Sequence, residues 1–139
     1  MAVTVSRCKT VLPASLSRVW NVVTDVKRYP EWRSDVERVE VPNDREFWEY
    51  TRDGYVTKFT ISREETERCW EFSMDNDHMT GRWVGIFRQR GKATIADFTE
   101  YVTAKKFWMR PFVKSYLKRQ QAQFAADLRA ALERLRLGQ

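Results

Sequence analysis

The last third of the chain carries apolar residues at helical spacing, and this stripe constrains the fold more than any other feature. From Trp108 onward the apolar positions recur at intervals of three and four: Phe112, Val113, Tyr116, Leu117, Phe124, Leu128, Ala131, Leu132 and Leu135. A helix over this range has about 28 residues and a length of about 40 Å. It is therefore long enough to cross a small sheet from one side to the other.

Basic residues are concentrated in the same part of the chain. Residues 105–139 hold nine lysines and arginines against Asp127 and Glu133, a balance of +7, whereas the rest of the chain carries −1. Most of these basic residues fall between the apolar positions, so we interpret them as the solvated face of the helix. Gln120 and Gln121 interrupt the apolar stripe, and each either faces solvent or meets a polar group inside.

Strand-like segments occupy most of the chain before this helix. Residues 2–12 and 36–41 are predicted strands, and each run stops at a proline. Between them, Ser15 or Ser17 can cap a short helix, and the segment Tyr29–Trp32 marks a second short helix.

Asp53-Gly54 predicts a tight two-residue hairpin turn, because both positions tolerate a positive φ. With Arg52 opposite Tyr55, one face of the hairpin is aromatic and the other carries an ion pair. The residues expected on the aromatic face are Trp48, Tyr50, Thr57 and Phe59.

Two further turns determine the register of the remaining strands. If Thr66-Glu67 is the next turn, Phe59 meets Met74 and Ile61 meets Phe72 on the same aromatic face. The last hairpin joins residues 80–89 to 93–103, and its turn can hold two or three residues. These alternatives direct opposite faces of the last strand inward: Asp97 and Tyr101 in one case, Phe98 and Glu100 in the other.

The predicted order is one strand, two short helices, six strands in an antiparallel meander and one long helix, which is an α+β arrangement. No linker-like run or repeat divides residues 1–139, so we expect one domain. Two cysteines, no signal segment and no apolar run of membrane-spanning length favour a cytoplasmic protein.

Several segments together resemble a known family: Val19-Trp20, Asp25, Tyr29–Trp32, the strand at Val36–Val41, and Gly81–Phe87 followed by the long terminal helix. They are similar to the polyketide cyclase/dehydrase and lipid-transport branch of the START-like (SRPBCC) helix-grip superfamily. The resemblance implies a seven-stranded curved antiparallel sheet wrapped around the C-terminal helix, with two short helices between strands one and two. It also implies a deep hydrophobic cavity between sheet and helix.

The function expected of such a cavity is binding of a small hydrophobic molecule: a lipid, a quinone or an aromatic polyketide. We expect it to be lined by Trp48, Tyr50, Phe59, Trp70, Phe72, Trp83, Phe87 and Phe124. Gly85 removes a side chain from this face, which permits bending of the sheet or leaves room for a ligand. The alternative is a polyketide cyclase or dehydratase that uses acid–base groups in the cavity, with Asp97 and Tyr101 as the catalytic candidates.

Other chemistries find little support in the sequence. The lone histidine, His78, lies in a polar turn, and no spacing typical of a metal site, a phosphate-binding loop or a nucleophile elbow is present. We therefore expect no metal and no cofactor. The aromatics are expected on the inner face of the sheet, which argues against a nucleic-acid partner. The segment Lys105–Arg110 has the composition of a membrane contact, but we favour a role at the entrance of the cavity or at the start of the helix.

Overall fold

The computed structural model describes residues 2–137, which form seven strands, two short helices and one long helix. The strands are β1 (Thr4–Leu12), β2 (Val36–Glu40), β3 (Glu46–Thr51), β4 (Val56–Glu65), β5 (Cys69–Asp75), β6 (Met79–Arg90) and β7 (Ala93–Ala104). The helices are α1 (Leu16–Thr24), α2 (Tyr29–Trp32) and α3 (Arg110–Leu137), with 3-10 turns η1 (Val26–Arg28) and η2 (Phe107–Met109). The predicted order of elements is confirmed.

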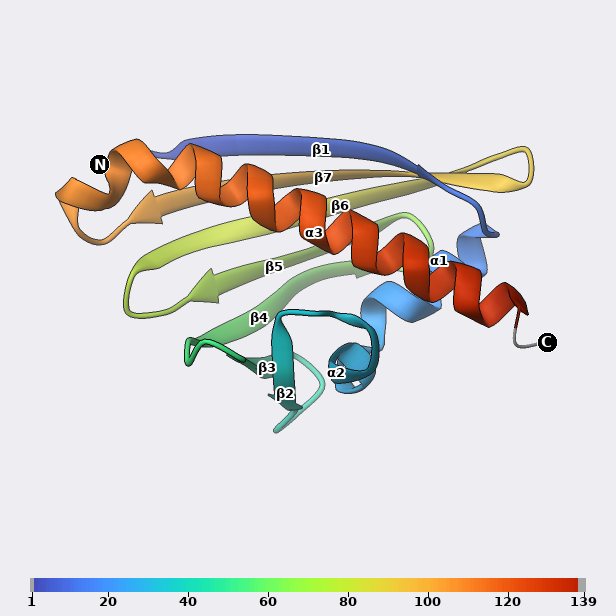
Figure 1. Cartoon of the computed structure of the whole chain (residues 1–139), viewed down its shortest axis with the longest axis horizontal. Helices are drawn as coiled ribbons and strands as arrows, with labels where there is room; N and C mark the ends of the chain where they lie inside the picture. The colour runs from blue at the N-terminus through green and yellow to red at the C-terminus, as the bar shows by residue number, and fades with distance from the viewer. Residues whose placement is uncertain (1, 138–139) are drawn as a thin grey trace.

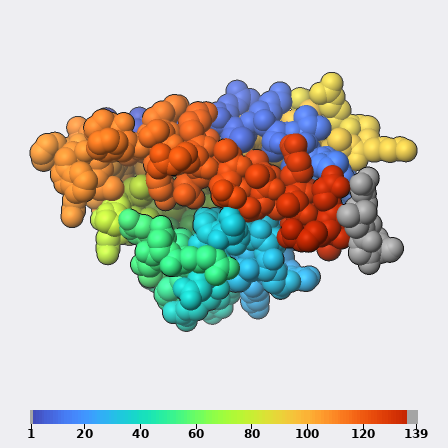
Figure 2. All heavy atoms as spheres, viewed as in Figure 1, coloured from blue at the N-terminus to red at the C-terminus, as the bar shows by residue number. Residues whose placement is uncertain are grey.

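All seven strands join one antiparallel sheet in the order β1-β7-β6-β5-β4-β3-β2. The sheet curves, and α3 runs along its concave side. The short helices α1 and α2 lie on the same side, next to the second half of α3 (Figure 1). Side chains close most of the space between the second half of α3 and the short helices, but a hollow remains between its first half and the β3–β4 loop (Figure 2). This is the predicted helix-grip arrangement.

The two short helices begin and end where the sequence provides caps. The hydroxyl of Ser15 accepts a hydrogen bond from the Arg18 amide, so Ser15 is the N-cap of α1. Pro30 occupies the first turn of α2, where its missing amide hydrogen costs nothing. The buried Tyr29 hydroxyl donates to the carbonyl of Val23 and ties the two helices together. Arg33, which follows α2, is thereby held over the interior of the sheet.

The β4–β5 hairpin has the predicted register. Phe59 pairs with Met74 and Ile61 with Phe72, as the Thr66-Glu67 turn required. Glu67 adopts a positive φ of 63° in this turn. Beyond Ile61 a bulge shifts the register of the strands.

The predicted register of the β3–β4 hairpin is wrong. Thr51 and Tyr55 close a three-residue loop instead of a two-residue turn: the Thr51 amide donates to the Tyr55 carbonyl at 2.9 Å, and the Gly54 amide to the Thr51 carbonyl at 3.1 Å. Gly54 takes the left-handed position, with φ 94°, that follows the turn in loops of this length. The Thr51 hydroxyl strengthens the loop by accepting from the Tyr55 amide at 2.9 Å.

One extra loop residue turns β3 over, because side chains alternate between the faces of a strand. Phe47 now pairs with Phe59 and stacks on it, with ring centroids 4.7 Å apart. Phe47 and Glu49 are therefore buried inside, whereas Trp48 and Tyr50 lie on the outer face.

The β6–β7 hairpin resolves the alternative that the sequence left open. Arg90 pairs with Ala93, so the turn holds two residues, Gly91 and Lys92. Trp83 then lies opposite Glu100 and shares its face. The even-numbered residues of β7 consequently point inward.

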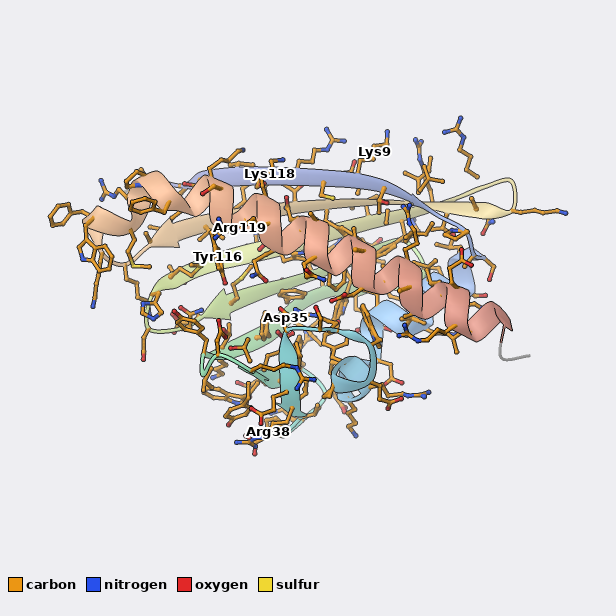
Figure 3. All side chains as sticks on the ribbon, viewed as in Figure 1. Lys9, Asp35, Arg38, Tyr116, Lys118 and Arg119 are labelled. Carbon is orange, nitrogen blue, oxygen red and sulfur yellow. The ribbon has the colours of Figure 1, made fainter. Side chains whose placement is uncertain are left out.

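The edge strand β1 is covered by polar side chains of α3. Lys114 and Lys118 donate to the carbonyls of Val5 and Arg7, and Arg129 reaches the carbonyl of Val11 at 2.9 Å. Figure 3 shows Lys118 beside β1. Gln121 of α3 also donates to a carbonyl of β1, that of Ser6. Part of the basic charge of α3 thus satisfies backbone carbonyls at the edge of the sheet.

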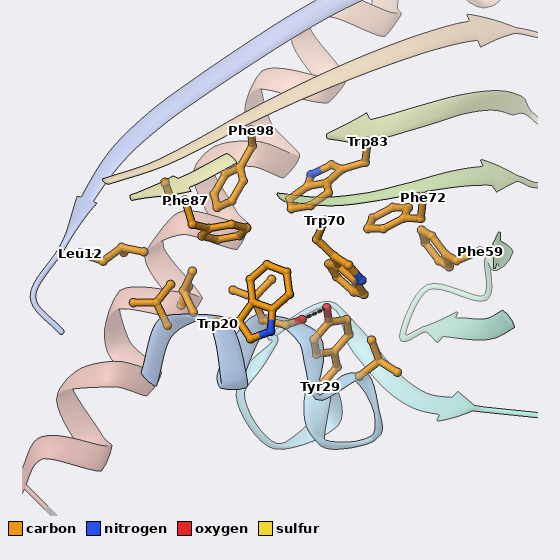
Figure 4. Packing of buried hydrophobic residues seen from close by; sticks show 14 of the residues in the cluster. Leu12, Trp20, Tyr29, Phe59, Trp70, Phe72, Trp83, Phe87 and Phe98 are labelled. Atoms are coloured by element: carbon orange, nitrogen blue, oxygen red, sulfur yellow. Dashed lines mark hydrogen bonds between the residues drawn. The ribbon is translucent and has the colours of Figure 1, made fainter. Parts of the chain in front are cut away.

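The core is an aromatic cluster between the sheet and the helices (Figure 4). Trp83 lies between Phe72 and Phe98, each stacked on it at a centroid distance of 5.0 Å. The indole of Trp83 extends over Gly85, where an added Cβ would lie 2.5 Å from a ring carbon. The missing side chain of Gly85 therefore makes room for Trp83 and not for a ligand.

Candidate functional site

A cavity of about 140 Å³ lies between the sheet and the first half of α3. Five of the residues predicted to line it do so: Phe59, Trp70, Phe72, Trp83 and Phe124. Two further aromatic residues, Tyr29 and Phe98, complete its apolar wall. We call this space the inner chamber.

Three residues predicted to line the cavity do not reach it. Phe87 is buried in the core, where its ring meets Trp20 edge-on at 5.5 Å. Trp48 and Tyr50 lie on the outer face because of the β3 register, and the guanidinium of Arg38 stacks on the Tyr50 ring at 3.6 Å. Trp48 and Tyr50 are therefore not part of the cavity wall, contrary to the prediction.

A second space of about 390 Å³, the outer chamber, adjoins the inner chamber. Seven residues line both chambers: Asp35, Thr51, Thr57, Asn76, Met79, Tyr116 and Gln120. Figure 3 shows Tyr116 and Arg119 on α3 and Asp35 across from them. His78 lies at the rim of the outer chamber, with its ring 5.1 Å from that of Tyr55. The two chambers therefore share part of their walls.

Arg33 is the only basic residue among those that line the inner chamber. Its guanidinium donates to Glu49 at 2.9 Å and to Asp35 at 3.1 Å. It also lies over the rings of Tyr29 and Phe124, 5.0 and 5.3 Å from their centroids. Burial opposes its charge, but Glu49 and Asp35 more than compensate and raise the pKa of Arg33. The guanidinium therefore stays charged.

Glu49 is buried, and burial raises its pKa although Arg33 acts in the opposite direction. The pair is held on one side by strand β3 and on the other by the residue that ends α2. Two donors nearby have no hydrogen-bond partner among the described residues: Arg33 Nε and Trp70 Nε1. Each unsatisfied donor costs about 1–3 kcal/mol.

Glu100 faces the inner chamber from β7. Burial in this largely apolar wall raises its pKa to about 7, while Arg33 and the Gln121 amide act against the shift. Gln121 is itself buried and held by Ser6, whose hydroxyl donates to it at 2.8 Å and whose carbonyl accepts from it at 2.9 Å. This explains the polar interruption of the apolar stripe, since Gln121 meets polar groups inside. A carboxyl with a pKa near neutrality can both accept and donate a proton.

Asp97 and Tyr101, the predicted catalytic candidates, lie on the outer face of the sheet. Asp97 accepts a hydrogen bond from Arg7 Nε at 2.9 Å, and this contact lowers the pKa of its carboxyl. The Tyr101 ring lies under the guanidinium of Arg82 at 4.5 Å. Neither side chain lines the inner or the outer chamber, so the structure brings Glu100 to the cavity in their place.

Two other features limit where the site can be and which chemistry it can perform. Among the described residues, no group of three His, Cys, Asp or Glu side chains is placed to hold a metal ion. A larger groove of about 500 Å³ lies between α1, α2 and the end of α3, but it is open and lined mainly by polar side chains such as Asn21 and Arg28. The aromatic cavity between the sheet and α3 is therefore the candidate site. A search of the helices within residues 2–137 found none long and apolar enough to cross a membrane.

The chain matches one known family over most of its length. The model of the family described as "Polyketide cyclase / dehydrase and lipid transport" matches residues 2–133. A search of curated proteins found no match.

Among solved structures, a START superfamily protein from Mycobacterium smegmatis has a TM-score of 0.88 at 15% identity, over 94% of this chain and 98% of that one. A conserved protein from Geobacillus kaustophilus has a TM-score of 0.85 at 8% identity, over 94% and 96%. The Zhui aromatase/cyclase from Streptomyces sp. R1128 has a TM-score of 0.82 at 14% identity, over 96% and 95%. At these identities the likeness establishes the fold alone.

Proposed function

Because this chain belongs to the polyketide cyclase/dehydrase and lipid transport family, we propose that it binds a small hydrophobic molecule in its inner chamber. The observation that carries the proposal is the aromatic space between the sheet and α3, which shares seven lining residues with the outer chamber. Apolar cavities with a few fixed polar groups are typical of small-molecule sites.

The size of the chambers restricts the ligand. A dry protein cavity of about 150 Å³ accommodates benzene. The inner chamber, at about 140 Å³, therefore fits a group of the size of one aromatic ring or a short branched chain. The remainder of a larger ligand would occupy the outer chamber of about 390 Å³. A quinone, a fused aromatic polyketide or a prenyl lipid has this shape.

The charges around the inner chamber restrict the ligand further. Asp35, Glu49 and Glu100 line it together with a single cation, Arg33, which is already bound to two of them. A carboxylate ligand would meet a site with an excess of negative charge and would lose its own hydration. We therefore expect a neutral ligand whose hydroxyl or carbonyl groups meet these side chains.

The proposal is tested by titrating the protein with 1,4-naphthoquinone and following tryptophan fluorescence, because Trp70 and Trp83 line the chamber. We expect saturable quenching in the wild type. Thr57→Phe fills the junction of the two chambers and should weaken binding at least tenfold. Thr60→Phe, on the outer face of the same strand, is the matched control and should leave affinity unchanged. Equal quenching in all three proteins would refute the proposed site.

Head-group selectivity needs a separate comparison with ligands of equal chain length. Decanol should displace the naphthoquinone at a lower concentration than decanoate does at pH 8, where Glu100 is largely ionised. Glu100→Gln should reduce the difference between the displacing concentrations of decanol and decanoate, because it removes one of the negative charges that repel the carboxylate. Preference for decanoate would contradict a neutral ligand without disproving the cavity.

A cyclase or dehydratase activity is the second candidate, favoured by the raised pKa of Glu100 in the chamber wall. A carboxyl of this kind can move a proton at a substrate carbonyl that lies in the chamber. The test is conversion of a poly-β-ketone thioester analogue, measured against the uncatalysed rate. Glu100→Gln should abolish the excess rate, whereas Asp97→Asn, on the opposite face of the same strand, should retain it. No excess rate in the wild type would leave binding as the function.

A further inference from the structure

Three large apolar side chains are exposed where α3 begins. Phe107 is 78% exposed, Trp108 58% and Phe112 65%. They lie at one end of the molecule, beyond the end of β7, where η2 leads into α3 (Figure 1). We call Phe107, Trp108 and Phe112 the entrance patch, because Trp108 and Phe112 also line the outer chamber.

Basic residues surround the entrance patch. Lys106 and Arg110 flank it directly in the sequence, are exposed, and make no ion pair with the side chains described for residues 2–135. Lys105 pairs with Asp75 at 2.8 Å, so its charge is partly balanced. The acidic residues that line the outer chamber are Asp35 and Asp53. The patch therefore combines exposed aromatic rings with uncompensated positive charge.

We propose that the entrance patch docks on an anionic lipid membrane. Aromatic side chains with neighbouring lysines and arginines are favoured at the interface between lipid and water. In this orientation the rings enter the interface and the basic groups meet the lipid phosphates. The outer chamber then opens beside the membrane, so an apolar molecule can pass between the bilayer and the chamber with little contact with water. The docking itself does not depend on which ligand the chamber takes.

The positive charge around this patch favours an anionic membrane over a second copy of the chain as its partner. Residues 105–119 contain six lysines and arginines and no acidic residue. Two copies packed through this face would bring these like charges together, which is unfavourable. An anionic bilayer offers the opposite charge over an extended surface.

The test is sedimentation of the full chain with vesicles of phosphatidylcholine alone or mixed with phosphatidylglycerol. We expect binding to the anionic vesicles only, weakened by salt. Phe107→Ser/Phe112→Ser should reduce the partition coefficient at least tenfold. Val11→Ser/Ile86→Ser removes two exposed apolar residues from elsewhere on the surface, 48% and 46% exposed, and should bind as the wild type does.

The basic residues are tested with a charge-matched pair of variants. Lys106→Gln/Arg110→Gln should lower partition by about fivefold per residue at low salt. Arg90→Gln/Lys92→Gln changes the net charge equally at the β6–β7 turn, at the opposite end of the molecule in Figure 1, and should have a much smaller effect.

Three results would overturn the proposal: no binding to anionic vesicles, equal losses in the matched variants, or a dimer in light scattering that the Phe107→Ser/Phe112→Ser variant loses. The last result would assign the patch to self-association. Circular dichroism of each variant checks that it is folded. Naphthoquinone binding in the same variants separates a failed membrane contact from a failed ligand site.

Discussion

Replacing Glu100 with glutamine should make the stability of the protein less dependent on pH. Burial raises the pKa of Glu100 from an ordinary value of 4.5 to about 7 in the folded protein. Between these two pH values the folded state binds the proton more tightly than the unfolded state does. Raising the pH therefore removes stability, and the loss is complete above the folded pKa.

The size of this loss follows from the same values. At about 1.36 kcal/mol per pH unit, the difference between about 7 and 4.5 corresponds to about 3 kcal/mol of unfolding free energy. Most of this loss of stability occurs between pH 5 and pH 8. Glutamine is neutral throughout, so Glu100→Gln should resemble the wild type near pH 4.5 and exceed its stability by about 3 kcal/mol at pH 8.

The assay is urea unfolding at pH 5, 6, 7 and 8, followed by tryptophan fluorescence. Asp97→Asn is the matched control, because Arg7 lowers the pKa of Asp97 and that contribution is lost only at pH values below its ordinary 3.8. Its profile from pH 5 to pH 8 should therefore run parallel to that of the wild type. Parallel profiles for Glu100→Gln as well would refute the placement of Glu100 in the chamber wall, and with it the register of β7.

Four further variants test the packing and the ion pairs of the sheet. Gly85→Ala should lower the unfolding free energy by about 1–3 kcal/mol and weaken naphthoquinone binding, because the new Cβ displaces the Trp83 indole; unchanged urea midpoints would contradict this. Arg33→Met should cost about 3–5 kcal/mol by leaving Glu49 buried without its partner. Arg33→Met/Glu49→Gln should recover part of that loss. If the losses of unfolding free energy from the two single substitutions simply add in the double variant, the two side chains do not interact. Asp97→Asn should change stability by less than about 1 kcal/mol at pH 7, since its pair is largely exposed.

The order of elements could be predicted because hydrophobic periodicity and turn residues act locally. The stripe on α3, the cap at Ser15 and the Thr66-Glu67 turn each depend on a few neighbouring residues. The register of β4 and β5 followed from that turn and was confirmed.

The faces of β3 could not be predicted as easily, because aromatic residues occur on both of them. Asp53-Gly54 fits a two-residue turn and equally the three-residue loop that the chain adopts. The Thr51 side chain, which accepts from the Tyr55 amide, is the local signal that favours the longer loop. On the outer face, Lys58 Nζ lies over the Trp48 ring, 5.8 Å from its centroid.

The polar groups of the site are the part that the sequence indicated least. Arg33 follows the short helix α2, and nothing local shows that it turns inward to meet Glu49. Glu100 was one of two alternatives that depended on the length of a single turn. These side chains come together only through tertiary packing. Their spacing along the chain therefore does not predict that they are close in space.

Native mass spectrometry of the full chain after incubation with 1,4-naphthoquinone tests most directly whether the inner chamber is a ligand site. We expect the wild type to carry one bound molecule and Thr60→Phe to do the same. Thr57→Phe, with the junction of the two chambers filled, should remain at the mass of the chain alone. An adduct of equal abundance in Thr57→Phe, or none in the wild type, would contradict the account.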